Sequence, residues 1–426
     1  YNKVTTNKIP QEDSQMDHLN ITLNQEEILQ LLSVDREDAF KRLLQDSLNS
    51  ILQAESTAQL GVEKYERSTE RKDSRNGSRE RTLKTRIGTI QLNVPRHRNV
   101  PFRTLIFDNY SRSEAALVST MTEMVVNGVS TRKVSTVIET LCGTSYSKST
   151  VSEVCKELDA HVKSFKNRPL TDAYPFIYVD ATYFKVRGSK RIESRALMVA
   201  LAYNESGCRE IIGFDVYENE SDDTWRSFLE SLKERGLDSL QMITSDSHKG
   251  ILYAISKVFP DVPWQRCQTH FSRNVLDHAP KKYQKAIHAE LTELYHCTTI
   301  DEARAKKEAI YNEYNEVADK AMECLDFGFE DAMTVLALPN GYRRFLRTSN
   351  HLERVNKELK RRSNVIGIFP NVDSLIRLMG SVLIELHEKY SLEQKLNISK
   401  KDKAALPLCK KQLRLIAIEQ QKMLAA

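Results

Sequence analysis

The chain has 426 residues, a formal net charge of +5 and a hydrophobic content of 40%. This length predicts about two to four domains, and the composition supplies enough apolar side chains for buried cores, which excludes a disordered or fibrous protein. No apolar run approaches the roughly 18 residues of a membrane span, and no signal-peptide pattern opens the chain. The seven cysteines form no Cys-x-x-Cys pair. Their odd number favours reduced thiols in the cytoplasm over a disulfide framework.

The first part of the chain, residues 1–62, is predicted to be helical. Thr22 or Asn24 can cap a short helix over residues 26–32, and a longer amphipathic segment follows Asp35. We interpret both as ordinary helical packing, with part of the apolar face available to a second subunit.

Residues 63–111 form a basic, partly β segment. Between Lys64 and Arg103 there are 12 Lys and Arg residues against 4 acids, and residues 85–95 alternate as a strand does. A solvated charged face is the ordinary alternative, but so compact a basic element favours contact with the phosphate backbone of DNA. The candidate contacts are Arg75, Arg79, Arg96 and Arg98.

Three helices are predicted over residues 113–126, 130–141 and 149–162, separated by Asn127-Gly128 and Cys142-Gly143. Ser149 is a good N-cap for the third helix. The arrangement over residues 112–168 is typical of a helix-turn-helix DNA-binding domain, and a small helical bundle is the alternative. Lys148 and Ser149 are the candidate DNA contacts at the start of the third helix.

Strands are predicted over residues 176–187, 194–203 and 208–217, followed by a helix up to residue 235. Asp180 lies in the middle of the first strand, where burying an unpaired carboxylate would cost several kcal/mol. A turn between two short strands would explain it, and so would a metal ion. Asp246 ends the next apolar run, at a position where open α/β sheets bind ligands. Helix N-capping is the alternative for this residue.

Cys267 and His270 form a Cys-x-x-His pair, which is half of a zinc site. His296 and Cys297 are the nearby residues able to complete it, but adjacent residues do not easily converge on one tetrahedron. We therefore do not favour zinc here.

Glu353 follows a possible cap at Asn350 and lies in a strongly basic segment. From Arg343 to Arg362 there are 8 Lys and Arg residues against 2 Glu. A capping box would explain Glu353, whereas the surrounding charge suits a polyanion lying beside a catalytic carboxylate. The candidate DNA contacts in this segment are Arg347, Arg354, Lys357 and Arg361.

Three acids in the order Asp180, Asp246 and Glu353, the last on a helix, resemble the catalytic triad of the DDE transposases. Over about residues 60–390 the chain is similar to the bacterial insertion-sequence branch of the Mutator-like transposases. The motifs that carry the resemblance are YVDATYFKVR (178–187), SDSHKG (245–250), CQTH (267–270), RTSNHLERVNKE (347–358) and GIFPN (367–371). Several motifs in the right order make the resemblance specific.

The resemblance implies an α/β protein with a ribonuclease-H-like catalytic core, interrupted by an all-α insertion domain and preceded by helical and helix-turn-helix DNA-binding regions. After the three N-terminal regions, we expect the core over residues 169–275 and 341–395, the insertion over 276–340 and a helical tail over 396–426. The order β-β-β-α-β-α-β predicted for the first core part agrees with this layout. The insertion also explains why Glu353 lies 107 positions after Asp246.

The expected function is binding of the terminal inverted repeats of an insertion sequence, followed by DNA cleavage and strand transfer. Asp180, Asp246 and Glu353 would hold two Mg²⁺ ions, with Mn²⁺ as a substitute. Cys267 and His270 would belong to the same active site. We expect a cytoplasmic, nucleoid-associated homodimer that acts on double-stranded DNA without a membrane. The alternatives are a ribonuclease-H-like nuclease that cuts without joining, and a non-catalytic DNA-binding protein derived from a transposase.

Overall fold

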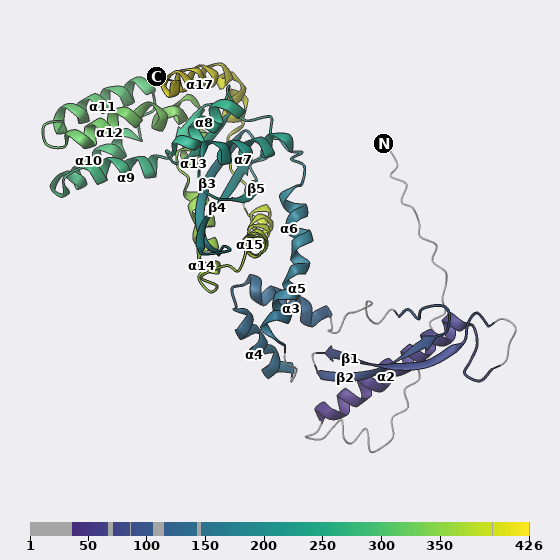
Figure 1. Cartoon of the computed structure of the whole chain (residues 1–426). Helices are drawn as coiled ribbons and strands as arrows, with labels where there is room; N and C mark the ends of the chain where they lie inside the picture. Colours follow the sequence, from purple (N-terminus) through teal and green to yellow (C-terminus); the bar gives the residue numbers. More distant parts are fainter. Residues whose placement is uncertain are drawn as a thin grey trace, which may run out of the picture. The chain divides into compact units, whose positions relative to one another are not determined.

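A computed structural model of the chain describes residues 36–66, 71–85, 87–104, 115–142, 146–393 and 395–425. It is a helix-rich, mixed α/β structure (Figure 1). The chain divides into two compact units: unit 1 comprises residues 1–125 and 131–154, and unit 2 comprises residues 126–130 and 155–426. The helix predicted over residues 26–32 lies outside the described residues.

Unit 1 contains one long helix packed along a β-hairpin. Helix α2 (Arg36–Leu60) lies against strands β1 (Arg75–Thr85) and β2 (Gly88–His97), which pair antiparallel. Alternate residues of β2 are buried, as expected for a strand with one covered face. The buried cluster consists of Leu52, Leu83, Ile90, Leu92 and Val94.

Helices α3 (Ala115–Val126), α4 (Thr131–Cys142) and α5 (Lys148–Val154) follow the hairpin. The single helix predicted over residues 149–162 is wrong, because the chain passes through a 3-10 turn, η1 (Cys155–Glu157), before α6 (Leu158–Lys166) begins. This turn starts where unit 1 gives way to unit 2. Neither glycine nor proline marks it, so the sequence carries no local signal for the break.

Unit 2 is built on a five-stranded mixed sheet with strand order β5-β4-β3-β6-β7. Strands β3 (Phe176–Arg187), β4 (Ile192–Tyr203) and β5 (Arg209–Tyr217) are antiparallel neighbours, whereas β6 (Met242–Ser245) and β7 (Trp264–Arg266) run parallel to β3. With α7 (Asp222–Glu234) and α8 (Lys249–Val258) in their places, the predicted order β-β-β-α-β-α-β is confirmed.

Helices pack on the sheet, and successive residues of each strand point to opposite faces of it. Ile177 and Val179 of β3 share a core cluster with Trp225 of α7 and Ile251 of α8. The intervening Tyr178 points the other way and bonds to the chain segment that precedes α14 (Asn350–Ser363). Helix α15 (Val372–Leu392) packs on β5 and α6.

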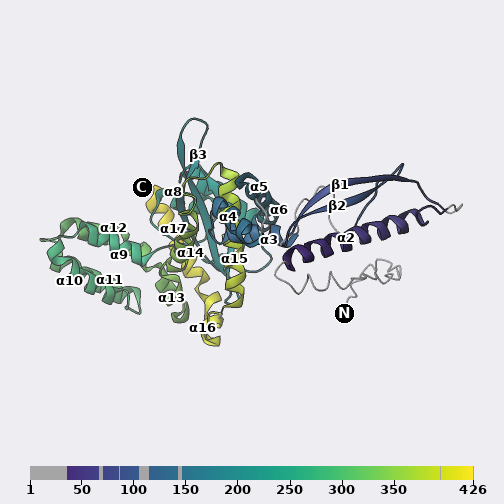
Figure 2. The same cartoon turned by 90° about the horizontal axis from the view of Figure 1, so that it is seen from below.

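Four helices between β7 and α14 have a core of their own. They are α9 (Gln268–His278), α10 (Lys281–Leu294), α11 (Ile300–Tyr314) and α12 (Asp319–Met333). A 3-10 turn, η2 (Thr334–Ala337), and α13 (Asn340–Leu346) return the chain to the sheet. Figure 2 shows the four helices extending together away from the sheet. Their position between the last strand and α14 is the one predicted for an all-α insertion.

The chain ends with α16 (Lys400–Ala405), a 3-10 turn, η3 (Leu406–Cys409), and α17 (Lys410–Ala425). Gln420 of α17 bonds to both backbone groups of Trp264 in β7: its side-chain oxygen accepts from the Trp264 N–H at 2.9 Å, and its amide donates to the Trp264 carbonyl at 2.8 Å. One glutamine thus covers part of the sheet edge. Within the described ranges, no helix is long and apolar enough to cross a membrane.

Candidate active site

Two aspartates are brought together by the register of neighbouring parallel strands. Strand β3 pairs with β6 up to the partners Tyr178 and Thr244. Two residues further along each strand direction lie Asp180, still within β3, and Asp246, just beyond the end of β6. Both carboxylates therefore lie at the carboxyl end of β6, where open α/β sheets bind their ligands.

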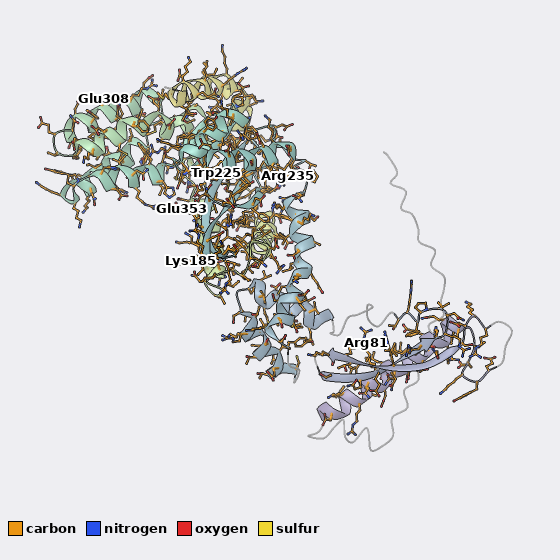
Figure 3. All side chains as sticks on the ribbon, viewed as in Figure 1. Arg81, Lys185, Trp225, Arg235, Glu308 and Glu353 are labelled. Carbon is orange, nitrogen blue, oxygen red and sulfur yellow. The ribbon has the colours of Figure 1, made fainter. Side chains whose placement is uncertain are left out.

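Hydrogen bonds to the sheet place the start of α14 at the same edge. The Tyr178 hydroxyl donates to the Phe345 carbonyl at 2.7 Å, and the Thr244 hydroxyl donates to the Leu346 carbonyl at 3.0 Å. The first turn of α14, which carries Glu353, is consequently held beside β3 and β6 (Figure 3).

The predicted capping role of Asn350 is wrong, because Asn350 is the first helical residue and Ser349 precedes it. The Ser349 hydroxyl makes no capping bond to the helix and instead donates to the Cys267 sulfur at 3.2 Å. Glu353 has no reciprocal bond to an N-cap residue among the described contacts, so the capping-box explanation for this acid is not supported.

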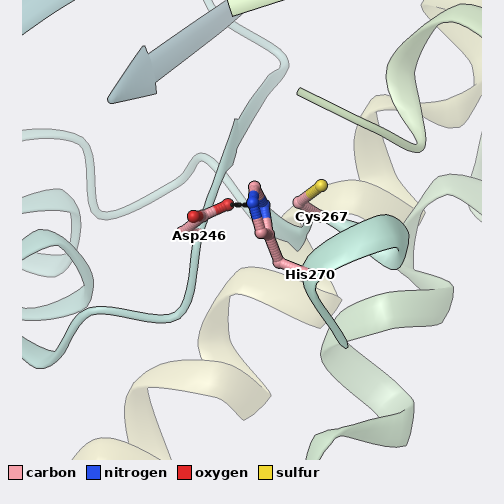
Figure 4. A group of neighbouring side chains, drawn as sticks. All are labelled: Asp246, Cys267 and His270. Atoms are coloured by element: carbon pink, nitrogen blue, oxygen red, sulfur yellow. Dashed lines mark ion pairs between the residues drawn. The ribbon is translucent and has the colours of Figure 1, made fainter. Parts of the chain in front are cut away.

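His270, in the first turn of α9, connects two of the acids. Its Nδ1 forms a close ion pair with Asp246 Oδ1 (Figure 4), and its Nε2 lies 3.3 Å from Glu353 Oε1. The hydrogen bond to Asp246, followed by that to Cys267, raises the pKa of His270 to about 10. The ring is therefore an imidazolium at neutral pH and balances charge between Asp246 and Glu353.

Asp180 is held by two donors. The Ala181 backbone N–H donates to Oδ1 at 2.8 Å, and the Asn356 side-chain amide donates to Oδ2 at 2.8 Å. Burial, with a smaller contribution from the negative charge of Asp246, raises the pKa of Asp180 to about 7. Sequence reasoning missed Asn356, although its place three residues after Glu353, on the same helix face, could have suggested it.

Cys267 completes the cluster. Its sulfur accepts hydrogen bonds from the Ser349 N–H at 3.3 Å and from the Ser349 hydroxyl. Burial alone would raise the pKa of Cys267, but the bonds from His270 and Ser349 outweigh it and hold the pKa below its usual value. Ser349 is a second residue that sequence reasoning missed.

Two sets of metal-capable groups overlap at this edge. Asp180, Asp246 and Glu353 offer oxygen ligands, which suit Mg²⁺, and a cation would offset the burial and the neighbouring charge of Asp246 that raise the pKa of Asp180. Among the described residues, however, these three acids do not have ligand atoms that all lie within 4.8 Å of one another. Asp246, Cys267 and His270 offer atoms within 4.8 Å of one another, a donor set better suited to zinc. In the part of the chain that the structure describes, neither His296 nor Cys297 joins that set.

The candidate DNA contacts in unit 2 differ in their surroundings. Arg354 and Lys357 are exposed on α14. Arg361 is also exposed but makes a two-pronged ion pair with Glu358, at 2.7 and 2.6 Å. Arg347 is half-buried, and its guanidinium lies 3.5 Å from the Tyr295 carbonyl. Of these candidates, Arg354 and Lys357 are the exposed cations in the first two turns of α14, next to Glu353, and Lys360 is a further exposed cation in its third turn.

In unit 1, Arg79, Arg96, Arg98, Lys148 and Ser149 are all exposed. Arg75 has a different environment. Its guanidinium donates to the Thr57 hydroxyl and to the carbonyls of Val62 and Glu63, and so fastens β1 to the end of α2. Because its donors are engaged within the fold, this arginine is the least available of the predicted phosphate contacts.

A mixed α/β sheet that gathers three acids beside a basic helix is the arrangement of a DNA-processing enzyme. The comparisons with known proteins make this specific: the family described as "Transposase, Mutator family" matches residues 15–392. The chain belongs to the Mutator family of transposases.

Several bacterial proteins resemble the chain over most of its length. The transposase for insertion sequence element IS256 in transposon Tn4001 of Staphylococcus aureus is 40% identical over 391 residues, which are 90% of this chain and 100% of that protein. The transposase for insertion sequence element ISRM5 of Rhizobium meliloti (strain 1021) is 38% identical over 353 residues, 83% of this chain and 89% of that protein. The transposase for IS1081 of Mycobacterium tuberculosis is 35% identical over 355 residues, 83% of this chain and 86% of that protein.

Proposed function

We propose that this chain is a DDE transposase with a ribonuclease-H-like core, which binds the terminal inverted repeats of an insertion sequence and catalyses Mg²⁺-dependent cleavage and strand transfer. The observation that supports the proposal is that Asp180, Asp246 and the first turn of α14, which carries Glu353, lie at the same edge of the sheet. Strand register sets the first two side by side, and His270 joins Asp246 to Glu353.

The three acids would hold two Mg²⁺ ions, for which Mn²⁺ could substitute. When bound, such ions activate an attacking oxygen and stabilise a leaving one. The remaining residues position the acids. Asn356 fixes one oxygen of Asp180, and Ser349 links the start of α14 to Cys267. His270 neutralises part of the charge of Asp246 and Glu353, so that both carboxylates can stay at one edge.

The reaction has two steps at one site. In the first, the oxygen of water bonds to phosphorus at the end of the element, and the bond from phosphorus to the 3′ oxygen breaks, which releases a 3′-hydroxyl. In the second, that 3′ oxygen attacks a phosphodiester of the target and displaces its 3′ oxygen, which leaves with a proton. No covalent bond to the enzyme is needed. Two ends must be joined, so a homodimer is the expected assembly.

DNA would be held by exposed cations of both units. The helix-turn-helix region and the basic hairpin of unit 1 would bind the terminal repeats, and the first turns of α14 would follow the strand at the site. We expect the protein to act in the cytoplasm, in association with the nucleoid.

The test of the triad uses Asp180→Asn, Asp246→Asn and Glu353→Gln, assayed with DNA carrying the ends of the element. Each should abolish both cleavage and joining while end binding persists, because a neutral amide cannot replace the charge that holds Mg²⁺. Normal turnover by any one variant would remove that residue from the site. A pre-cleaved 3′-hydroxyl end tests joining separately: a protein that cuts but never joins would be a nuclease instead.

A further inference from the structure

A groove of about 610 Å³ opens beside the catalytic acids. Its walls come from α9, α10 and the segment between α13 and α14. Thr269 in its lining precedes His270, and Thr348 and Asn350 in its lining flank Ser349, which bonds to Cys267. The groove therefore begins where the active site ends.

Most of the residues that line the groove carry a polar or charged group. Hydroxyl and amide groups such as those of Thr269, Ser272, Gln284 and Thr292 dominate it, and Leu276 is its one aliphatic side chain. Sites for small organic ligands are predominantly apolar. Hydroxyl, amide and arginine groups are instead the side chains that contact the phosphates and sugars of nucleic acid.

The groove also carries positive charge. On other faces of these helices three cations are compensated, because Arg304 pairs with Glu330, Lys306 with Glu290 and Glu293, and Lys307 with Glu308 and Asp326. Lys282 and Lys320, by contrast, are exposed there. The groove is lined by two arginines, Arg273 and Arg347, against one carboxylate, Asp277. Its walls include the first turns of α9 and α14, whose helix dipoles add partial positive charge.

We propose that this groove holds the sugar–phosphate backbone of the DNA strand that continues from the scissile phosphodiester, with Arg273 and Arg347 contacting its phosphates. The inference rests on the proposed function, because it takes that function's substrate to enter at the acids. It adds a path for the strand, between the insertion helices and the start of α14. It also assigns a role to Arg273, which no sequence motif had indicated.

Binding of the full-length chain to a fluorescein-labelled 12-nucleotide oligothymidylate, measured by anisotropy over a series of KCl concentrations without divalent metal, tests the proposal. For the Arg273→Ala/Arg347→Ala variant, the slope of log K against log[KCl] should be shallower than for the unmodified chain by about 1.4, since each phosphate contact on a single strand contributes about 0.7. The matched control is Lys282→Ala/Lys320→Ala. It removes two exposed charges from α10 and α12 that do not line the groove and should leave the slope unchanged.

A second variant separates the loss of charge from a loss of folding. Arg273→Lys/Arg347→Lys keeps both charges and should restore most of the slope. Equal slopes for the alanine variant and the unmodified chain would overturn the proposal, and so would an equal loss in the control.

Photo-crosslinking locates the strand directly. Oligothymidylate containing 4-thiothymidine should crosslink to peptides within residues 268–296, and crosslinks confined to other segments would overturn the proposal. Neither readout needs cleavage. If the chain crosslinks within these residues but never cuts DNA, the groove proposal stands and the proposed function fails. If it cuts DNA normally but crosslinks only elsewhere, the groove proposal alone fails.

Discussion

Asp180, one of the three proposed catalytic acids, lies in an unfavourable environment for its charge. Its pKa of about 7 in the folded chain stands above the ordinary value of 3.8, so between these values the folded protein binds a proton that the unfolded chain has released. Stability associated with this group is fully present below about pH 4 and is lost as the pH rises through 7. In the proposed mechanism this carboxylate binds metal, and the fold tolerates its charge at a cost of up to about 4 kcal/mol.

We therefore predict that the metal-free protein loses stability between about pH 4 and pH 7, and that Asp180→Asn largely removes this loss because the amide does not ionise. Urea unfolding of both proteins in EDTA across this range measures the effect. At pH 8, millimolar Mg²⁺ should reduce the difference in the free energy of unfolding between the two proteins, since a bound cation offsets the carboxylate charge. Identical pH dependence in the two proteins would show that Asp180 ionises normally.

Asn356 joins α14 to β3, the strand that carries the proposed metal ligand Asp180. Its amide bond to Asp180 orients the carboxylate, and residues that support metal ligands in this way typically cost 10- to 100-fold in activity when removed. Asn356→Ala should lower kcat by roughly that factor and move the acidic limb of the pH profile upward, because Asp180 loses a hydrogen bond that favours its ionised form. DNA affinity should not change.

The control for this variant is Asn364→Ala, at the exposed C-terminal end of the same helix. It should match the unmodified chain in kcat, in the pH profile and in DNA affinity. An Asn356→Ala variant with a weaker DNA affinity but an unshifted pH profile would point to a structural role alone.

At the scale of elements, α17 acts on the sheet through one side chain. Gln420 bonds both to the Trp264 backbone and, at 2.8 Å, to Asp331 near the end of α12, so it connects the tail, β7 and the insertion helices. Gln420→Ala leaves these partly buried groups without their partner and should lower the free energy of unfolding by about 1–3 kcal/mol. Urea denaturation measures this, and Lys422→Ala, exposed on the same helix, should be neutral.

For the whole molecule, the structure separates arginines that build unit 1 from those that face solvent. The triple variant Arg79→Ala/Arg96→Ala/Arg98→Ala should reduce the salt dependence of end binding by about 0.9 per lost phosphate contact, with the melting temperature unchanged. Arg75→Ala should instead lower the melting temperature and leave the salt dependence unchanged, because Arg75 fastens β1 to α2. If Arg75→Ala alone altered the salt slope, the assignment of the two groups would be reversed.

The sequence was sufficient for the order of strands and helices around the acids, because alternating apolar residues and short motifs are local signals. It also brought Asp180, Asp246 and Glu353 to attention as a set. The spacing from Glu353 could have drawn attention to Asn356, but it could not identify the partner of Asn356, which lies 176 residues away. For the same reason, the sequence could not predict the position of His270 between Asp246 and Glu353 or the hydrogen bonds of Gln420 to β7. Both depend on segments that meet only after folding.

The attachment of α17 to β7 bears on how the protein is handled in the laboratory. The family match ends at residue 392, which makes that position a natural place to shorten the chain for expression. Cutting there would remove Gln420 and leave the backbone N–H and carbonyl of Trp264 uncovered at the end of the sheet. Bare strand edges recruit strands from other molecules. A shortened protein should thus precipitate or form concentration-dependent aggregates, and solubility would be lost for a reason unrelated to its chemistry.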